Sequence, residues 1–256
     1  MTPFELLRPA TLGEALSHLD AEDARPLSGG TALMLMMKAG VLRPKRLVSL
    51  AGLRLDTIEA NGALRIGAMT TLRSLETSDA VRKGWPVIMR TLRTLSNVRV
   101  RNVATVGGAL AHADPHMDLP PLLAALGARL TLQGKQGSRT VPVEELYAGY
   151  LETTLKPGEL ITRVEVPPLG KRRAAYLKCT TRSADDWPAV GVAVVLGDEN
   201  RIFVSAATDR PTRLADEASI EGLRIEGDLH GSAEYKRQLL RVYLKRAIHE
   251  ARNASH

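Results

Sequence analysis

Two short glycine stretches contain the residue types that could hold an anionic ligand. The first reads Ser28-Gly29-Gly30-Thr31-Ala32, and the second reads Thr105-Val106-Gly107-Gly108-Ala109. A glycine pair lets backbone N–H groups approach a ligand closely, and the hydroxyls beside it supply further donors. We expect two such turns, facing each other, to hold the two phosphates of a dinucleotide. Each stretch alone also fits an ordinary glycine turn that binds no ligand.

The residues around the first stretch predict a small α/β unit over 1–55. Its expected elements are a helix, a strand, a helix and a strand at residues 9–19, 25–27, 33–37 and 46–50. Thr11 can cap the first helix, because Glu14 follows three residues later as in a capping box. The second helix would begin directly after the glycine turn, which adds favourable partial positive charge for an anion.

The second predicted unit, 56–168, combines a hairpin with helices and strands. Asn61-Gly62 lies between two alternating segments and predicts a hairpin over 57–67 with a type I′ turn. Helices are expected from residue 70 and over 86–95 and 119–126, and strands over 129–132, 139–143 and 159–166. Pro167-Pro168-Leu169-Gly170 is the best linker candidate in the chain.

The last third of the chain predicts an antiparallel sheet followed by helices. Strands are expected at 174–178, 189–196 and 201–207, and the main helix at 233–252, where apolar side chains share one face. Strands followed by helices are typical of an α+β domain, which we assign to 171–256.

The composition is that of an ordinary soluble globular protein. The chain has 256 residues, of which 44% are hydrophobic and 25% charged, enough for a core divided into two or more subdomains. Its apolar runs are too short to cross a bilayer, and its first residues lack the features of a signal peptide. We therefore expect a cytoplasmic protein without a membrane span. The single cysteine, Cys179, excludes an internal disulfide, a zinc cluster and an all-cysteine iron–sulfur site within this chain.

The positive charge does not by itself indicate a nucleic-acid partner. The formal net charge is +7, but the basic residues are scattered, and aromatic residues make up only 4% of the chain. That content is too low for a base-stacking platform. We therefore expect no nucleic-acid binding; an acidic partner protein, or plain solvation, accounts for the charge.

Five motifs follow one another along the chain, at residues 26–33, 101–111, 118–126, 157–161 and 176–182. In sequence and order they are similar to the motifs of one family, the FAD-binding medium subunits of molybdenum hydroxylases of the carbon monoxide dehydrogenase and xanthine dehydrogenase type. The resemblance covers essentially the whole chain and implies an α+β architecture. The implied fold is a two-subdomain FAD-binding fold of the vanillyl-alcohol-oxidase/PCMH type, followed by a small antiparallel-sheet-plus-helices C-terminal domain. FAD would lie extended between the first two subdomains.

The resemblance also implies cofactor-binding residues, but no catalytic residue and no metal ligand. The two glycine stretches would hold the pyrophosphate through backbone amides and hydroxyls, and Asp118 would bind hydroxyls on the flavin side. Backbone near Leu160 and Ile161 would line the flavin, and Lys178 would stabilise negative charge at its N1/O2 edge. The segment with Asp185-Asp186 either tunes the flavin or forms an ordinary turn. The implied cofactor-binding residues are Leu27, Ser28, Gly29, Gly30, Thr31, Ala32, Thr105, Gly107, Gly108, Ala109, Asp118, Leu160, Ile161 and Lys178.

Two departures from the family pattern concern the site. Ala109 stands where the family usually has asparagine, so one side-chain hydrogen bond to FAD would be missing and the affinity for FAD would fall. The segment His116-Met117-Asp118 also differs from the usual pattern, which puts local contacts in question. Histidine and aspartate alternate from His112 to Asp118, and on a strand these side chains would point to one side. A divalent-metal site therefore stays open beside the interpretation as a flavin-lining loop.

The resemblance implies an electron-transfer flavoprotein within a larger oxidoreductase. Electrons would pass from the [2Fe-2S] clusters of a small partner subunit through FAD to an external acceptor. A large partner subunit would hold the molybdenum cofactor and hydroxylate the substrate, and the expected hetero-oligomer is a dimer of heterotrimers. Two alternatives stay open, namely a stand-alone FAD-dependent oxidase or reductase of the same fold and an assembly subunit that has lost FAD.

Overall fold

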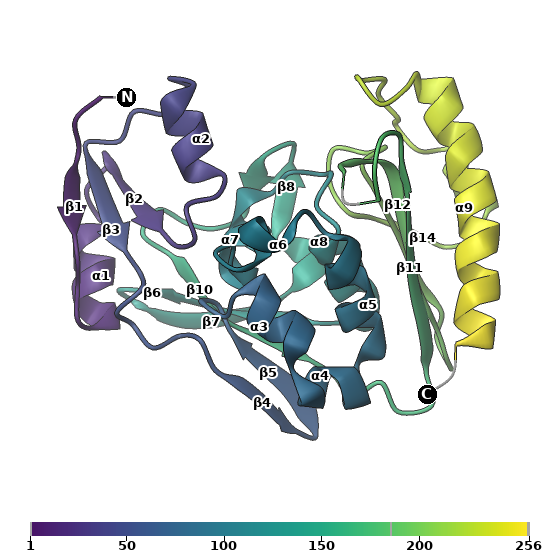
Figure 1. Cartoon of the computed structure of the whole chain (residues 1–256), viewed down its shortest axis with the longest axis horizontal. Helices are drawn as coiled ribbons and strands as arrows, with labels where there is room; N and C mark the ends of the chain where they lie inside the picture. Colours follow the sequence, from purple (N-terminus) through teal and green to yellow (C-terminus); the bar gives the residue numbers. More distant parts are fainter. Residues whose placement is uncertain (1, 185, 255–256) are drawn as a thin grey trace.

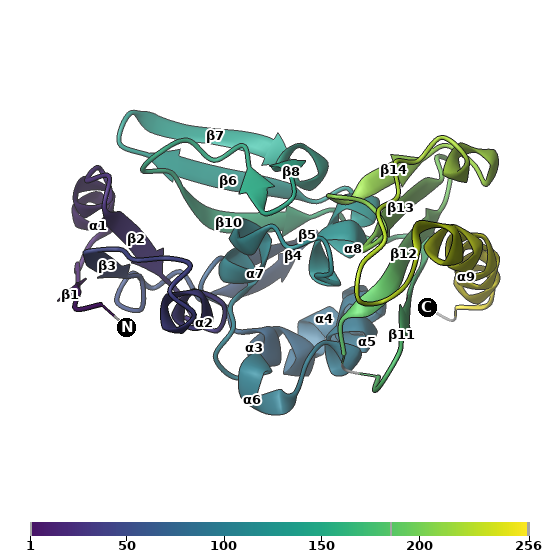
Figure 2. The ribbon, with the colours of Figure 1, turned by 90° about the horizontal axis from the view of Figure 1, so that it is seen from above.

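The computed structural model describes residues 2–184 and 186–254, in which three main β-sheets follow one another along the molecule (Figure 1). The N-terminal sheet lies at one end and the C-terminal sheet at the other, with the largest sheet and most of the helices between them. Figure 2 shows the same order from above. Within the described residues, no helix is both long and apolar enough to span a bilayer.

The N-terminal unit is a three-stranded parallel sheet with two helices. Its elements are β1 (Glu5–Leu7), α1 (Leu12–His18), β2 (Ala24–Leu27), α2 (Leu33–Lys38) and β3 (Arg46–Ser49), and β3 pairs in parallel with β1 and β2. The predicted cap of the first helix is confirmed. The Thr11 hydroxyl accepts from the Glu14 N–H at 3.2 Å, and the Glu14 carboxylate accepts from the Ala10 N–H at 2.8 Å. The strand, turn and helix predicted around the first glycine stretch are β2, residues 28–32 and α2.

The middle unit has a five-stranded antiparallel sheet in the order β4-β5-β10-β6-β7 and six helices, among the described residues. Its elements are β4 (Ile58–Asn61), β5 (Ala63–Gly67), α3 (Leu72–Thr77), α4 (Asp79–Gly84), α5 (Pro86–Thr94), α6 (Val98–Arg101), α7 (Val106–His112), α8 (Leu119–Leu126), β6 (Arg129–Gly134), β7 (Gly137–Pro142), β8 (Tyr147–Gly149), β9 (Glu152–Thr153) and β10 (Leu160–Val166). The predicted hairpin is confirmed as β4–β5, but the type I′ turn is wrong. Only Gly62 takes a positive φ, 77°, whereas a type I′ turn needs positive φ at Asn61 as well.

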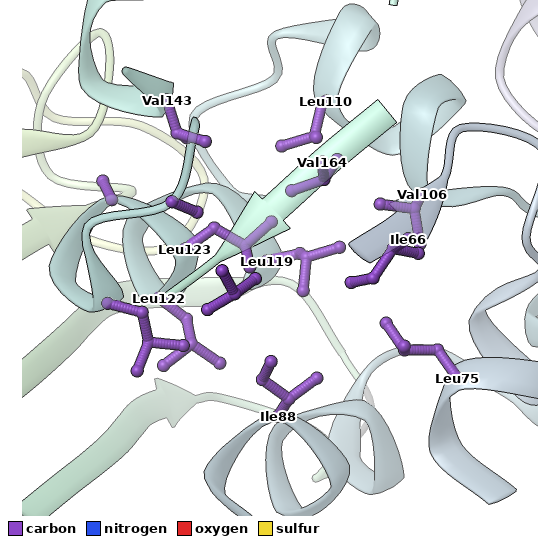
Figure 3. Packing of buried hydrophobic residues seen from close by; sticks show 14 of the residues in the cluster. Ile66, Leu75, Ile88, Val106, Leu110, Leu119, Leu122, Leu123, Val143 and Val164 are labelled. Carbon is purple, nitrogen blue, oxygen red and sulfur yellow. The ribbon is translucent and has the colours of Figure 1, made fainter. Parts of the chain in front are cut away.

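Helix α8 is the centre of the main hydrophobic core. All eight of its residues are buried, since its residues are apolar. Its two prolines lie in the first turn, where they break no helical hydrogen bond. Figure 3 shows Leu119, Leu122 and Leu123 facing Ile88 of α5 and Val164 of β10. The core is thus formed between the middle sheet and the helices that cover it.

The C-terminal unit is a four-stranded antiparallel sheet covered by one long helix. Its elements are β11 (Arg173–Thr180), β12 (Pro188–Leu196), β13 (Arg201–Ser205), β14 (Thr212–Leu214) and α9 (Ala233–Asn253). The three predicted strands and the long helix are confirmed, and β14 is an addition. Strand β12 is buried on both faces: Val192 and Val194 pack under α9, whereas Ala193 and Val195 join the main core beside α8. The domain boundaries at 55/56 and 168/171 stay predictions.

Candidate functional site

The two glycine stretches meet, as the sequence predicts. The Ser28 hydroxyl oxygen lies 2.5 Å from the Thr105 hydroxyl oxygen, and the Ser28 hydroxyl also contacts the Met69 sulfur at 3.1 Å. A Cβ on Gly29 would lie 2.2 Å from the Val103 carbonyl oxygen, so only glycine fits at this contact. Two segments far apart in the sequence therefore form one junction.

The first stretch presents unpaired backbone donors. Within the described residues, none of the four N–H groups from Gly29 to Ala32 donates a hydrogen bond. Gly30 takes a left-handed φ of 71°, and α2 begins at Leu33 immediately afterwards. Successive unpaired N–H groups before a helix form a concave site of partial positive charge that suits a phosphate group. The geometry of this stretch therefore fits the diphosphate of a dinucleotide.

The expectation of a second glycine turn is wrong, because Gly107-Gly108 lies in the first turn of α7. Thr105 caps this helix, and its hydroxyl accepts from the Gly108 N–H at 3.1 Å. Gly107 allows close packing rather than an unusual conformation, since a Cβ there would lie 2.7 Å from the Cβ of Ala68. All N–H groups of this first turn donate within the chain. The second stretch therefore contributes a helix cap, and its Gly108 carries no side chain beside the Ser28 and Thr105 hydroxyls. The unpaired amides belong to the first stretch.

A buried ion pair supports the segment that leads into α7. The Arg101 guanidinium donates to the Glu76 carboxylate at 2.9 Å, and their side chains are 10% and 7% exposed. It also donates to the carbonyl oxygens of Leu95 and Ser96. Burial raises the pKa of Glu76, but hydrogen bonds from Arg73 and Arg101 outweigh it and hold that pKa below its usual value. Arg101 is therefore a support for the loop before Thr105.

The contact between Gly29 and Val103 predicts the effect of one added methyl group. Because the Cβ of Gly29→Ala would overlap a backbone oxygen, the two stretches must separate, and the free energy of unfolding is expected to fall by about 1–3 kcal/mol. Urea denaturation followed by circular dichroism measures the change. Gly84→Ala is the control, because a Cβ at Gly84 meets nothing within 4 Å. Equal stability of the two variants would contradict the observed junction.

A second polar group follows the C-terminal end of α7. This helix has seven residues and is therefore about 10 Å long at 1.5 Å per residue. Asp118 and Lys178 form an ion pair at 3.0 Å, with side chains 5% and 7% exposed. The Tyr176 hydroxyl donates to the other Asp118 carboxylate oxygen at 2.6 Å. The Lys178 ammonium also donates to the main-chain oxygens of Thr94 at 2.8 Å and Asp186 at 3.2 Å. Its three N–H groups therefore all have acceptors within the chain.

The electrostatics of this group follow from its burial. Burial raises the pKa of Asp118, and the Lys178 ammonium and the Tyr176 hydroxyl oppose that rise. Burial and the neighbouring carboxylate raise the pKa of Tyr176 well above its ordinary value, so the phenol is a neutral donor. Tyr176 was not among the predicted site residues. Tyr176 lies two residues before Lys178 on the same strand, so both side chains are on one face of the sheet. This spacing would have been sufficient to predict Tyr176 as a neighbour of Lys178.

Leu160 and Ile161 lie at the start of β10, and these residues are 4% and 6% exposed. Leu160 packs into the core of the N-terminal unit and Ile161 into the main core. A register shift between Ile161 and Arg163 interrupts the pairing of β10 with β6. Any contact of Leu160 or Ile161 with a cofactor would therefore come from the backbone, as the resemblance implies.

The alternating histidine and aspartate segment is not a strand, contrary to the premise of the metal-site alternative. His112 ends α7, Ala113 takes a left-handed φ of 56°, and the next five residues form a loop before α8. Across 2–184 and 186–254, no three His, Cys, Asp or Glu side chains are placed to share a metal ion. Asp185, which the sequence places beside the flavin or in a turn, lies outside the described residues.

Part of the positive charge gathers around a surface hollow of about 400 Å³. Its lining includes Lys83, Arg90, Lys171 and Arg173, and none of its described lining residues is acidic. The hollow lies beside the segment that joins the middle and C-terminal units. It shares no residue with the two glycine stretches.

Comparison with known proteins adds independent information. Residues 2–169 match the family described as the FAD binding domain in molybdopterin dehydrogenase. The chain is 32% identical to the carbon monoxide dehydrogenase medium chain of Afipia carboxidovorans, covering 97% of this chain and 96% of that one. It is 30% identical to the glyceraldehyde dehydrogenase medium chain of Sulfolobus acidocaldarius, covering 96% and 98%. The structure is similar to that of carbon monoxide dehydrogenase from Hydrogenophaga pseudoflava, with a TM-score of 0.92 and 30% identity over 98% of this chain and 97% of that chain.

Proposed function

Because this chain belongs to the family of FAD-binding domains of molybdopterin dehydrogenases, as an FAD-binding medium subunit, we propose that it passes electrons between a partner subunit and an external acceptor. The similarities confirm the predicted fold class and confirm FAD as the cofactor. They also confirm the oxidoreductase family. Since the relatives are named medium chains, this chain works together with partner subunits.

The observation that carries the proposal is the row of unpaired N–H groups from Gly29 to Ala32, beside the Ser28 and Thr105 hydroxyls. This row would hold the pyrophosphate of FAD, with the Leu27 side chain and the Thr31 hydroxyl next to it. Gly108 would contribute by leaving room for the cofactor beside the Ser28 and Thr105 hydroxyls. Gly107 would act indirectly, because it lets the first turn of α7 pack against Ala68. Ala109 offers no side-chain hydrogen bond, so FAD binding would be weaker than with asparagine at this position.

The Asp118–Lys178 group would lie at the flavin end of the cofactor. FAD supplies one-electron and two-electron transfer when bound. A buried cation near the ring favours negative charge there, so Lys178 would raise the reduction potential. The backbone at Leu160 and Ile161 would line the ring. In this assignment no side chain acts as an acid or a base.

The proposed partners are a small subunit with [2Fe-2S] clusters and a large subunit with the molybdenum cofactor, assembled as a dimer of heterotrimers. Electrons would enter this chain from the nearer cluster. The hydroxylated substrate would bind to the large subunit, and no nucleic acid takes part. The cytoplasmic location stays a prediction.

Purification of the tagged full chain, expressed together with its neighbouring genes, tests the proposal. We expect one FAD per chain from the visible spectrum, and iron and molybdenum in the same complex by elemental analysis. Rapid mixing with the chemically reduced iron–sulfur subunit should bleach the flavin.

The alternatives give different outcomes. A colourless chain that takes up no added FAD would indicate the assembly subunit. A yellow chain without iron, whose flavin is reduced directly by an organic substrate, would indicate the stand-alone oxidase or reductase.

A further inference from the structure

The His116 ring lies between two carboxylates. Its Nδ1 atom is 2.9 Å from an Asp114 oxygen, and its Nε2 atom is 3.1 Å from an Asp228 oxygen. The side chains of Asp114 and His116 are 6% and 11% exposed. An ionised carboxylate only accepts hydrogen bonds, so both ring nitrogens must carry hydrogen for both contacts to form. The geometry therefore requires the imidazolium form of His116.

The surrounding charges balance only in this form. The Lys236 ammonium, whose side chain is 1% exposed, donates to the same Asp228 oxygen at 2.7 Å and to the Ala206 carbonyl at 2.9 Å. Two carboxylates then face two cations, whereas a neutral His116 would leave one buried negative charge uncompensated. Two further titratable groups are near, namely His112 of α7, which acts on Asp114, and His230, whose ring lies 5.4 Å from that of His116.

These contacts join three segments of the chain. Asp114 and His116 belong to the loop of residues 113–118, which ends at Asp118, and Asp228 belongs to the turn before α9. The Trp187 ring stacks on His116, with ring centres 5.4 Å apart and planes within 13°. The neighbouring residue, Asp186, provides a main-chain acceptor for Lys178.

We propose that His116, as an imidazolium cation, is a positioning residue that ties the 113–118 loop to the turn before α9 and seats Trp187. These contacts of His116 also keep two acceptors of Lys178 in place, namely the Asp118 carboxylate and the Asp186 carbonyl oxygen. Any effect of His116 on a flavin beside Lys178 rests on the proposed function. The contacts of His116 with Asp114, Asp228 and Trp187 do not themselves involve FAD. A failure of this proposal and a failure of FAD binding are therefore distinguishable.

The direction of the pH dependence follows from the neighbours. Burial lowers the pKa of His116, but the hydrogen bonds to Asp114 and Asp228 outweigh it and raise that pKa above its usual value. A histidine whose pKa is higher in the folded state stabilises that state fully at pH values below its unfolded-state pKa, about 6.5. The tie should then be lost as the pH rises through the folded-state pKa. The pKa values of Asp114 and Asp228 are lowered, so both stay ionised across this range.

Imidazole ¹⁵N spectra of the full chain test the protonation state of His116. At pH 7 we expect both ring nitrogens to be protonated, and the signal is assigned by its absence in His116→Gln. Asp228→Asn should lower the midpoint of the His116 titration by about one pH unit. A wild-type ring with one unprotonated nitrogen at pH 7 would overturn the proposal, as would an unchanged midpoint in Asp228→Asn.

Tryptophan emission tests whether the tie reaches Trp187. A stacked imidazolium quenches indole emission, so emission should rise with pH at the midpoint found by NMR. His116→Gln and Trp187→Phe should each remove this step, and the matched control His249→Gln, at an exposed position of α9, should keep it. The other tryptophan, Trp85, is 5% exposed and should give a constant background. A step that persists in His116→Gln would contradict a role for His116 in seating Trp187.

Discussion

Replacing Gly108 with aspartate is expected to abolish FAD retention while leaving the chain folded. A Cβ at Gly108 would lie 3.0 Å from the Thr105 hydroxyl and 3.5 Å from the Ser28 hydroxyl. The added carboxylate would therefore enter the junction of the two glycine stretches and repel the pyrophosphate. We expect the affinity for FAD to fall by at least about 100-fold, which corresponds to about 2.8 kcal/mol. Flavin absorbance after purification and titration with added FAD measure this loss.

The fold should tolerate this variant, because an acidic side chain in the first turn of a helix is favourable. Gly13→Asp is the matched control: it makes the same substitution in the first turn of α1, where a Cβ at Gly13 meets nothing within 4 Å. The control should keep its FAD and its stability. Full FAD occupancy in Gly108→Asp would contradict the placement of the diphosphate at this junction.

The second large effect is expected from Lys178→Met, which removes the cation buried against Asp118. Breaking a buried pair leaves an uncompensated charge, and the free energy of unfolding is expected to fall by about 3–5 kcal/mol. The Asp118 carboxylate would also lose the largest of the interactions that oppose the rise of its pKa, and only the Tyr176 hydroxyl would still oppose it. Urea denaturation of the full chain measures the change. FAD should be retained, because its pyrophosphate is assigned elsewhere, but its reduction potential should fall.

A double-mutant cycle separates the pair from its surroundings. Asp118→Asn combined with Lys178→Met leaves no buried charge, so the double variant should be more stable than the sum of the single effects predicts. Strictly additive losses would show that the two side chains do not stabilise each other. An unchanged reduction potential in Lys178→Met would place the flavin ring away from Lys178.

Local signals in the sequence were sufficient for much of the fold. Thr11 and Glu14 specify the start of α1 because both partners of the cap lie within one helical turn. Gly127, in a left-handed conformation with φ of 77°, ends α8 as expected for a helix C-terminus. The contact between the two glycine stretches also followed from the motifs, although no single-residue pattern states which atoms meet.

The features that the sequence did not predict depend on tertiary packing. Glycine is unfavourable in a helix interior, so the sequence predicted a turn at Gly107 and Gly108. The cap from Thr105 and the close packing of Gly107 against Ala68 stabilise a helix there instead. The partners of Lys178 come from α5, the loop before α8 and the segment before β12. His116 meets Asp228 across more than a hundred residues. Such contacts between distant segments leave no periodic signal.

Hydrogen–deuterium exchange of the full chain, with and without FAD, tests the central claim most directly. The amides from Gly29 to Ala32 donate no hydrogen bond to any described residue, so without FAD they should exchange fast and with FAD they should be strongly protected. The amides from Gly107 to Ala109 are already bonded within the chain and should change little. Unchanged exchange from Gly29 to Ala32 at saturating FAD would contradict this account.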